Sequence, residues 1–259
     1  MHLGPDIIAL LMAAAFMAGT IDAIAGGGGL ISIPALLAAG LPPVAAIATN
    51  KLQSTFGTGG AVLAYARKGH IDLKRFAVPA LASFLGSALG AYILTLVDPG
   101  FLSGLLPVLL LAMVIYFVAA PKMTDEDRHS RGGPTLLAVI GCYDGFFGPG
   151  TGSFFTTALV ALFGLGLLRA VAHTKLLNFA SNVAGLAVLV AGGHVLWVVG
   201  LAMALANFAG GQLGAHVAIR FGANVARPLL IIVSLALTAK LLWDPANPLT
   251  AAALRVLGS

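Results

Sequence analysis

Apolar stretches of nearly membrane-spanning length follow one another along this chain, separated only by short polar or glycine-rich interruptions. About 20 consecutive apolar residues form enough helix to cross the roughly 30 Å hydrocarbon core of a bilayer. The pattern predicts helical segments at residues 5–25, 29–40, 43–66, 74–96, 101–120, 134–148, 151–163, 168–191, 195–219 and 226–243. We therefore expect an all-α polytopic membrane protein.

Two of these segments, 29–40 and 151–163, are too short to cross a bilayer alone. About twelve residues of α-helix extend only roughly 18 Å. Each short segment follows a glycine-rich run, Gly26–Gly29 or Gly148–Gly152, and should form a broken hairpin with the segment before it. Irregular backbone at that depth is tolerated only where it faces protein or a watery cavity. The breaks are therefore expected in the interior of the protein.

The second half of the sequence repeats the first at an offset of about 124 residues. Matched positions include Gly26–Gly28 with Gly150–Gly152, Lys51 with Lys175, Gly86 with Gly210, and Gly90 with Gly214. Asp22 corresponds to Asp144 if the second copy is two residues longer before its glycines. We divide the chain into a first repeat, 1–124, and a second, 125–259, joined by a polar linker around 121–133 into one membrane domain.

The spacing of Gly86 and Gly90, and of Gly210 and Gly214, is typical of helices whose backbones approach closely. Its recurrence predicts the same helix contact in each half.

The basic residues predict the orientation of the two halves. Ten of the fourteen fall on one side of the expected bilayer: Arg67, Lys68, Lys74, Arg75, Lys122, Arg128, Arg131, Arg169, Arg220 and Arg227. Cytoplasmic loops are enriched in such residues, so both termini should be external. Five segments per repeat is an odd number, which gives the two copies opposite orientations and makes them an inverted repeat.

Composition agrees with this assignment. The chain is 59% hydrophobic and 9% charged, far from the quarter-charged composition of soluble domains. The net charge of +5 does not indicate nucleic-acid binding, because most basic residues lie in short loops between apolar segments. The single cysteine, Cys142, excludes an internal disulfide and has no metal-ligand spacing. We predict neither a cofactor nor a metal site.

The glycine runs and the matched lysines are the candidate components of a binding site. Each run opens a short helix, whose unpaired N–H groups and positive dipole end favour an anion. Lys51 and Lys175 lie inside apolar segments at comparable depths, where a lysine costs at least about 2.5–3.5 kcal/mol on insertion scales. The predicted substrate-binding residues are Gly27, Gly28, Gly29, Asn50, Lys51, Ser54, Gly150, Thr151, Gly152, Thr174, Lys175, Asn178 and Asn182.

Three alternatives to this anion site stay open. In one alternative the glycines serve only tight hairpin packing, and in the others the lysines snorkel or form structural ion pairs with Asp22 or Asp144. These two aspartates, each a few residues before a break, suit either proton coupling or structural pairing. We expect Tyr143 to place a hydroxyl beside Asp144. His173, next to Thr174 and Lys175, is a further candidate for lining the path of the substrate.

Four stretches resemble the TauE/SafE sulfite exporter family, in the expected order over almost the full chain. They are Gly26–Ser32, Thr49–Ser54, Tyr143–Ser153 and Thr174–Asn182. The resemblance implies a bacterial inner-membrane carrier for sulfur-containing anions such as sulfite, thiosulfate, sulfoacetate or related organosulfonates. It does not choose among these substrates or between import and export.

The residues and the resemblance both indicate a secondary anion transporter rather than an enzyme, working by alternating access between two repeats. Its partners would be a small anion, the lipid bilayer and possible coupling protons, and it could be an oligomer. Two other classes remain: an intramembrane hydrolase using Asp22 and Asp144, and a non-transporting membrane assembly factor. Neither explains the paired glycine breaks.

Overall fold

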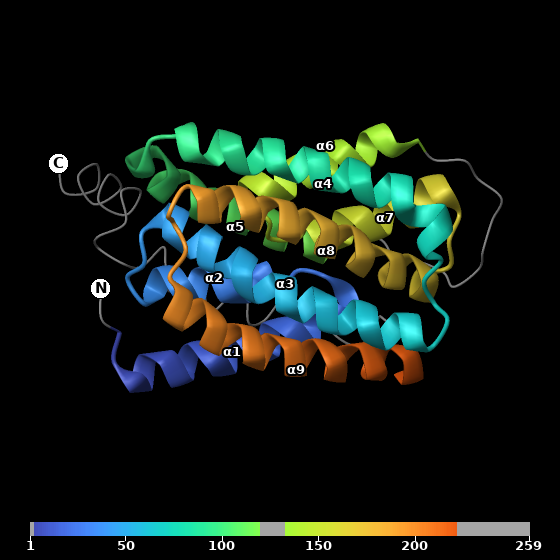
Figure 1. The fold of residues 1–259 in the computed structure, drawn as a ribbon, viewed down its shortest axis with the longest axis horizontal. Coiled ribbons are helices and arrows are strands. Elements are labelled where there is room, and N and C mark those ends of the chain that lie inside the picture. Colours follow the sequence, from blue (N-terminus) through green and yellow to red (C-terminus); the bar gives the residue numbers. More distant parts are fainter. Residues whose placement is uncertain (1–2, 120–132, 222–259) are drawn as a thin grey trace.

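A computed structural model describes residues 3–119 and 133–221, and every regular element in these ranges is an α-helix (Figure 1). The first half contributes α1 (Pro5–Ala25), α2 (Gly29–Ala38), α3 (Pro43–Arg67), α4 (Leu73–Leu96) and α5 (Pro99–Ala119). The second contributes α6 (Pro134–Phe146), α7 (Thr151–Phe163), α8 (Leu167–Ala191) and α9 (Trp197–Phe221). The all-α prediction is confirmed. The expected helix 226–243 and most of the expected linker around 121–133 lie outside the described residues.

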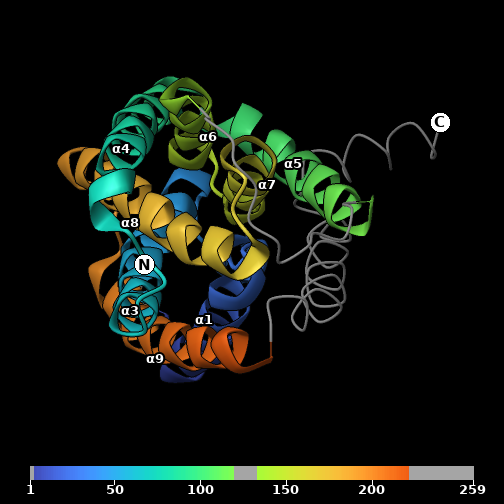
Figure 2. The ribbon, with the colours of Figure 1, turned by 90° about the vertical axis from the view of Figure 1, so that its right-hand side faces the viewer.

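Corresponding helices make corresponding contacts in the two halves. α1 packs on α9, and α6 packs on α4. Because α6 corresponds to α1 and α4 corresponds to α9, these two contacts are equivalent. α3 and α8 contact each other, α3 also packs on α9, and α8 also packs on α4. Viewed along the helices, α4 and α6 lie on one side, α1 and α9 on the other, and α3 and α8 between them (Figure 2). Contacts between the two halves therefore occur on both sides of the molecule as well as in its middle.

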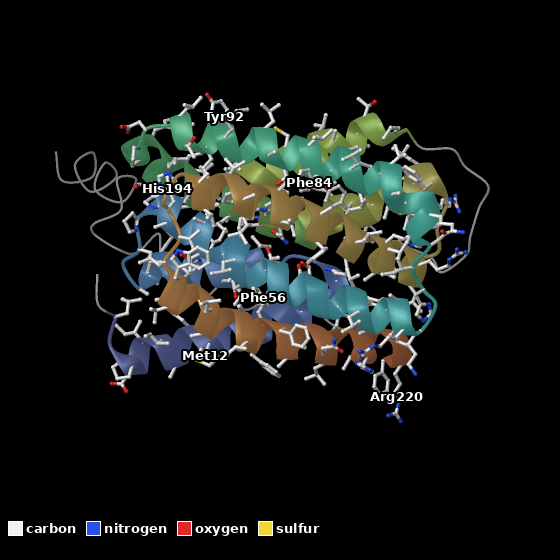
Figure 3. All side chains as sticks on the ribbon, viewed as in Figure 1. Met12, Phe56, Phe84, Tyr92, His194 and Arg220 are labelled. Carbon is white, nitrogen blue, oxygen red and sulfur yellow. The ribbon has the colours of Figure 1, made fainter. Side chains whose placement is uncertain are left out.

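Equivalent helices also run in opposite directions. In Figure 1, α1 and α3 run from left to right, whereas α6 and α8 run from right to left. The end of α3 and the start of α4 lie at the right, as do the start of α8 and the end of α9. These ends carry Arg67, Lys68, Lys74, Arg75, Arg169 and Arg220. In Figure 3, Arg220 lies at this end and His194 at the other.

The glycine pairs on α4 and α9 mark close helix contacts, as predicted. A Cβ on Gly90 of α4 would lie 1.9 Å from the carbonyl oxygen of Cys142 on α6. A Cβ on Gly214 of α9 would lie 2.1 Å from the carbonyl oxygen of Thr20 on α1. Only glycine permits backbones to approach this closely.

The outer surface is apolar along the long helices. Large exposed side chains on α4 and α9 include Leu81, Leu85, Leu89, Leu201 and Leu205, and Figure 3 shows side chains projecting from these outer faces, with Tyr92 on α4. Among the described helices, α1, α4, α8 and α9 are long and apolar enough to span a membrane. The chain is therefore a polytopic membrane protein, whose exposed leucines face lipid.

Candidate functional site

Two glycine-containing breaks meet at the centre of the molecule. α1 ends at Ala25, and Gly26 and Gly27 adopt φ values of 79° and 100° before α2 begins. The break between α6 and α7 uses Gly148 and Gly150, at φ 97° and 82°. These left-handed conformations are readily accessible only to glycine.

The two breaks touch each other across the halves. A Cβ on Gly26 would lie 2.8 Å from the carbonyl carbon of Gly152. The hydroxyl of Ser153, in the first turn of α7, donates to the carbonyl oxygen of Ala25 at 3.2 Å. The start of α7 is thus held against the end of α1.

Each lysine forms an ion pair with the aspartate of the other half. Lys51 Nζ lies 3.0 Å from Asp144 Oδ1, and Lys175 Nζ lies 2.9 Å from Asp22 Oδ2. The two lysine side chains are fully buried, at 1% and 0% exposure. The ion-pair alternative is therefore what the structure contains, with the pairs crossed between the halves.

The carboxylate of Asp22 also binds the start of α2. Asp22 Oδ1 accepts hydrogen bonds from the backbone N–H groups of Gly27 and Gly28, at 3.1 and 3.2 Å. Its other oxygen accepts from Lys175, which also donates to the backbone carbonyl of Asp22. An internal carboxylate therefore occupies the helix terminus that the sequence suggested for a ligand anion.

Asp144 is held differently. Its Oδ1 faces Lys51, and its Oδ2 accepts a hydrogen bond from the hydroxyl of Ser181 on α8. The expectation that Tyr143 supplies this hydroxyl is wrong. Tyr143 donates instead to the carbonyl oxygen of Pro149 at 2.8 Å, because its ring packs among Phe147 and Phe154 on the far side of the break.

A second polar layer ties each short helix to the long helix that follows it. In the first half, the Ser32 hydroxyl on α2 donates to Asn50 Oδ1 on α3 at 2.6 Å. At the equivalent positions of the second half, the hydroxyls of Thr156 on α7 and Thr174 on α8 lie 3.0 Å apart. Thr174 therefore supports α7 from behind.

The breaks and the long helices enclose a polar cavity of about 30 Å³. This volume is on the scale of one or two water molecules. The lining residues are Ala18, Asp22, Gly27, Gly28, Gly29, Asn50, Ser54, Thr58, Asp144, Gly148, Gly150, Thr151, Gly152, Asn178, Asn182 and Asn207. Most of the predicted site residues are thus brought together. Lys51 and Lys175 stand one layer back, beside the carboxylates, and Thr174 is not in the lining.

Four lining residues were not among the candidates, and Asn207 of α9 is the most informative. Its Nδ2 donates to the carbonyl oxygen of Ala15 and to Gln53 Oε1, both at 3.0 Å. The side chain fits because Gly19 and Gly57 lack a Cβ where it passes. An amide inside an apolar run is the signal that would have identified it. The other three are Ala18, Thr58 and Gly148.

His173 lies away from this cavity. Its ring stacks on Phe76 with centroids 3.9 Å apart, and its Nε2 accepts from the backbone N–H of Asp72 at 3.0 Å. In the other half, Thr49 Oγ1 accepts from the backbone N–H of Leu196 at 3.3 Å. The two side chains are equivalent at the 124-residue offset, and each anchors a loop to a long helix.

Comparison with known proteins identifies the family of this chain. The family model described as "Sulfite exporter TauE/SafE" matches residues 11–241.

The chain belongs to the TauE/SafE family.

Several curated TauE/SafE relatives match nearly the full length of the chain. "Probable membrane transporter protein ORF9" of Sinorhizobium sp. is 52% identical over 248 residues, covering 94% of this chain and 95% of the relative. "Probable membrane transporter protein" of Haemophilus influenzae is 43% identical, covering 94% and 98%. "Probable membrane transporter protein YfcA" of Escherichia coli K12 is 42% identical, covering 93% and 91%. No solved structure gives a significant match. The chain is therefore a membrane transporter of this family.

Proposed function

We propose that the protein is a secondary carrier for a small sulfur-containing anion, such as sulfite, thiosulfate, sulfoacetate or another organosulfonate. One observation carries the proposal: two short helices begin at glycine breaks around a buried polar cavity, and a lysine from each half lies directly behind it. A sulfite or sulfonate group offers several acceptor oxygens to such donors. The family description, "Sulfite exporter TauE/SafE", agrees with this substrate class.

The transport cycle we propose is alternating access, in which the inverted halves 1–124 and 125–259 rock against each other. The cavity lies where the halves meet, and its volume of about 30 Å³ is too small for a sulfonate with its organic group. Binding therefore requires the two breaks to separate. The crossed ion pairs connect the halves, and each pair can separate and form again during such a movement.

We place the protein in the bacterial inner membrane with both termini external. This orientation rests on the basic residues at the ends of α3 and α9 and the starts of α4 and α8, which lie on one side. Single cysteines introduced at Lys68 and at His194 of a Cys142→Ser chain would test it. A membrane-impermeant maleimide added to intact spheroplasts should label position 194 and not position 68. The reverse labelling would contradict the proposed orientation.

Transport is tested with purified protein in liposomes. We expect uptake of labelled sulfite or sulfoacetate to exceed that of protein-free vesicles and to be competed by unlabelled organosulfonates but not by a small carboxylate. A hydrolase would instead form product in detergent without any vesicle. An assembly factor would transport nothing and would tolerate neutral residues at both lysines. Each carboxylate has its own lysine partner, whereas a two-carboxylate hydrolase depends on interacting carboxyl groups.

A further inference from the structure

The carboxylate of Asp22 is held entirely by hydrogen-bond donors. It accepts from the backbone N–H groups of Gly27 and Gly28 at 3.1 and 3.2 Å, and from Lys175 Nζ at 2.9 Å. Backbone N–H and ammonium groups cannot accept a hydrogen bond. A proton added to this carboxylate would therefore find no acceptor among the described residues, and it would displace one of the donors.

Asp144 has one partner that can either donate or accept. Its Oδ1 lies 3.0 Å from Lys51 Nζ, and its Oδ2 accepts from the Ser181 hydroxyl. The same hydroxyl lies 3.0 Å from the backbone carbonyl oxygen of Asn178 and can donate there instead. A hydroxyl has one donor and two acceptor sites, so a protonated Asp144 can donate to Ser181 while Ser181 donates to Asn178. The ionised and the protonated forms of Asp144 are thus both hydrogen-bonded.

The other titratable groups near Asp144 belong to the two ion pairs or are bound elsewhere. Asp144 lines the cavity from α6, which packs on α4, α7 and α8, and Asp22 faces the same cavity from α1. The hydroxyl of Tyr143 donates to a backbone carbonyl of the second break, and the ring of His173 accepts from the loop before α4. The remaining charged side chains of these helices and of α3 are Lys51 and Lys175 beside the cavity, and Arg67, Lys74, Arg75 and Arg169 at the helix ends.

The charge balance of the cavity explains why an anion would bring a proton with it. The two ion pairs sum to zero, so an anion adds an uncompensated charge to a buried site, which is strongly disfavoured. If Asp144 is neutralised, the buried Lys51 ammonium keeps a hydrogen bond to Asn182 Oδ1 at 3.1 Å but has no counterion. The anion can then take that place. Anion binding and protonation of Asp144 therefore favour each other.

We propose that Asp144 takes up one proton with each monovalent anion that binds, so that the protein catalyses electroneutral anion–proton symport. The proton passes from water that enters the cavity to Asp144 Oδ2. The Ser181 hydroxyl turns from this oxygen to the Asn178 carbonyl, and Lys51 gains the anion as its counterion. Lys175 and Asp22 stay paired and hold the start of α2. The proposal rests on the proposed function and adds its coupling ion.

The test uses the full chain in liposomes and methanesulfonate, which stays monovalent over the pH range of the assay. A trapped pH indicator reports protons, and potassium with valinomycin sets the membrane potential. We expect an inward methanesulfonate gradient to acidify the lumen by one proton per anion, and the initial uptake rate to be equal at zero and at inside-negative potential.

Asp144→Asn should carry the anion without acidifying the lumen. Each transport step then moves net negative charge, so an inside-negative potential should slow uptake severalfold. Asp98→Asn is the matched control, because it makes the same change at an exposed carboxylate in the loop before α5. This control should keep one proton per anion and a rate that does not depend on potential.

Wild-type uptake that moves no protons, or that slows at inside-negative potential, would overturn this inference whether or not the Asp144 variant folds. One proton per anion in a folded Asp144→Asn chain would also overturn it. Each of these results leaves an anion carrier in place. Wild-type vesicles that take up none of methanesulfonate, sulfite and sulfoacetate would overturn the proposed function as well.

Discussion

Lys51 and Asp144 belong to different halves of the chain, and their charged atoms lie 3.0 Å apart in a buried ion pair. Lys175 and Asp22 form the reciprocal pair at 2.9 Å. The four residues therefore connect the halves at the cavity. The charge around the cavity and the stability of the fold thus depend on the same side chains.

A double-mutant cycle separates these two roles. Lys51→Met keeps the bulk of the lysine stem but leaves Asp144 unpaired and buried, so we expect a loss of stability of about 3–5 kcal/mol. Lys51→Met with Asp144→Asn removes both charges and should recover most of that stability without recovering anion binding. Thermal unfolding in detergent and methanesulfonate titration provide the two measurements. Wild-type affinity in a folded double variant would show that this ion pair has no part in binding.

Asp22→Asn and Asp144→Asn test proton coupling. Asparagine keeps an acceptor oxygen but cannot titrate. If an aspartate couples protons to transport, its asparagine variant should still exchange the anion but should not accumulate it. In liposomes, the relevant variant should exchange labelled anion across the membrane and fail to concentrate it under an imposed pH gradient. Accumulation that survives in both variants would exclude these two residues as proton carriers.

Alanine at Gly90 should separate α4 from α6. Its Cβ would lie 1.9 Å from the Cys142 carbonyl oxygen, and both contacting groups are backbone that cannot rotate away. Overpacking of this kind costs about 1–3 kcal/mol, so the midpoint of thermal unfolding should fall by several degrees. Gly104→Ala is the matched control, because a Cβ there meets nothing within 4 Å. Equal midpoints for the two variants would refute the close contact.

Asp72 caps α4 outside the membrane, and its contribution to stability should depend on pH. The backbone N–H of Arg75 donates to Asp72 Oδ1 at 3.0 Å, and this hydrogen bond lowers the pKa of the carboxyl below its ordinary value of 3.8. A lowered folded-state pKa means that the stabilisation is present above the unfolded value and is lost as pH falls through the folded value. Asp72→Ala should therefore unfold at a lower temperature than wild type at pH 7. The difference should shrink when both are measured below the ordinary value. A difference that stays constant with pH would assign the effect to something other than the charged cap.

The sequence predicted the bounds of the helices better than the contacts between side chains of different helices. Segments 5–25 and 151–163 have the predicted bounds, because proline or glycine marks their ends, whereas 195–219 begins two residues later at Trp197. The glycine breaks were located for the same local reason.

Which aspartate faces which lysine could not be predicted, because helix periodicity fixes the face of a residue but not the neighbour across the interface. Tyr143 illustrates the same limit. It adjoins Asp144 in sequence, yet successive residues on a helix point about 100° apart, so its hydroxyl reaches Pro149 instead. The partner of Asp144, Ser181, comes from a helix 37 positions away in the chain.

The crossed ion pairs also set an order for biosynthesis. When the first half has entered the membrane, Lys51 and Asp22 are both present, but neither of the partners found in the folded protein has yet been made. A nascent chain that stops before Asp144 therefore holds a lysine and an aspartate within its apolar segments without the partner that each has in the folded protein, and a charge left unpaired there costs several kcal/mol. Its release from the insertion machinery should wait for α6 and α8, and a chain truncated at the linker should become a substrate for membrane proteases rather than a stable half-protein.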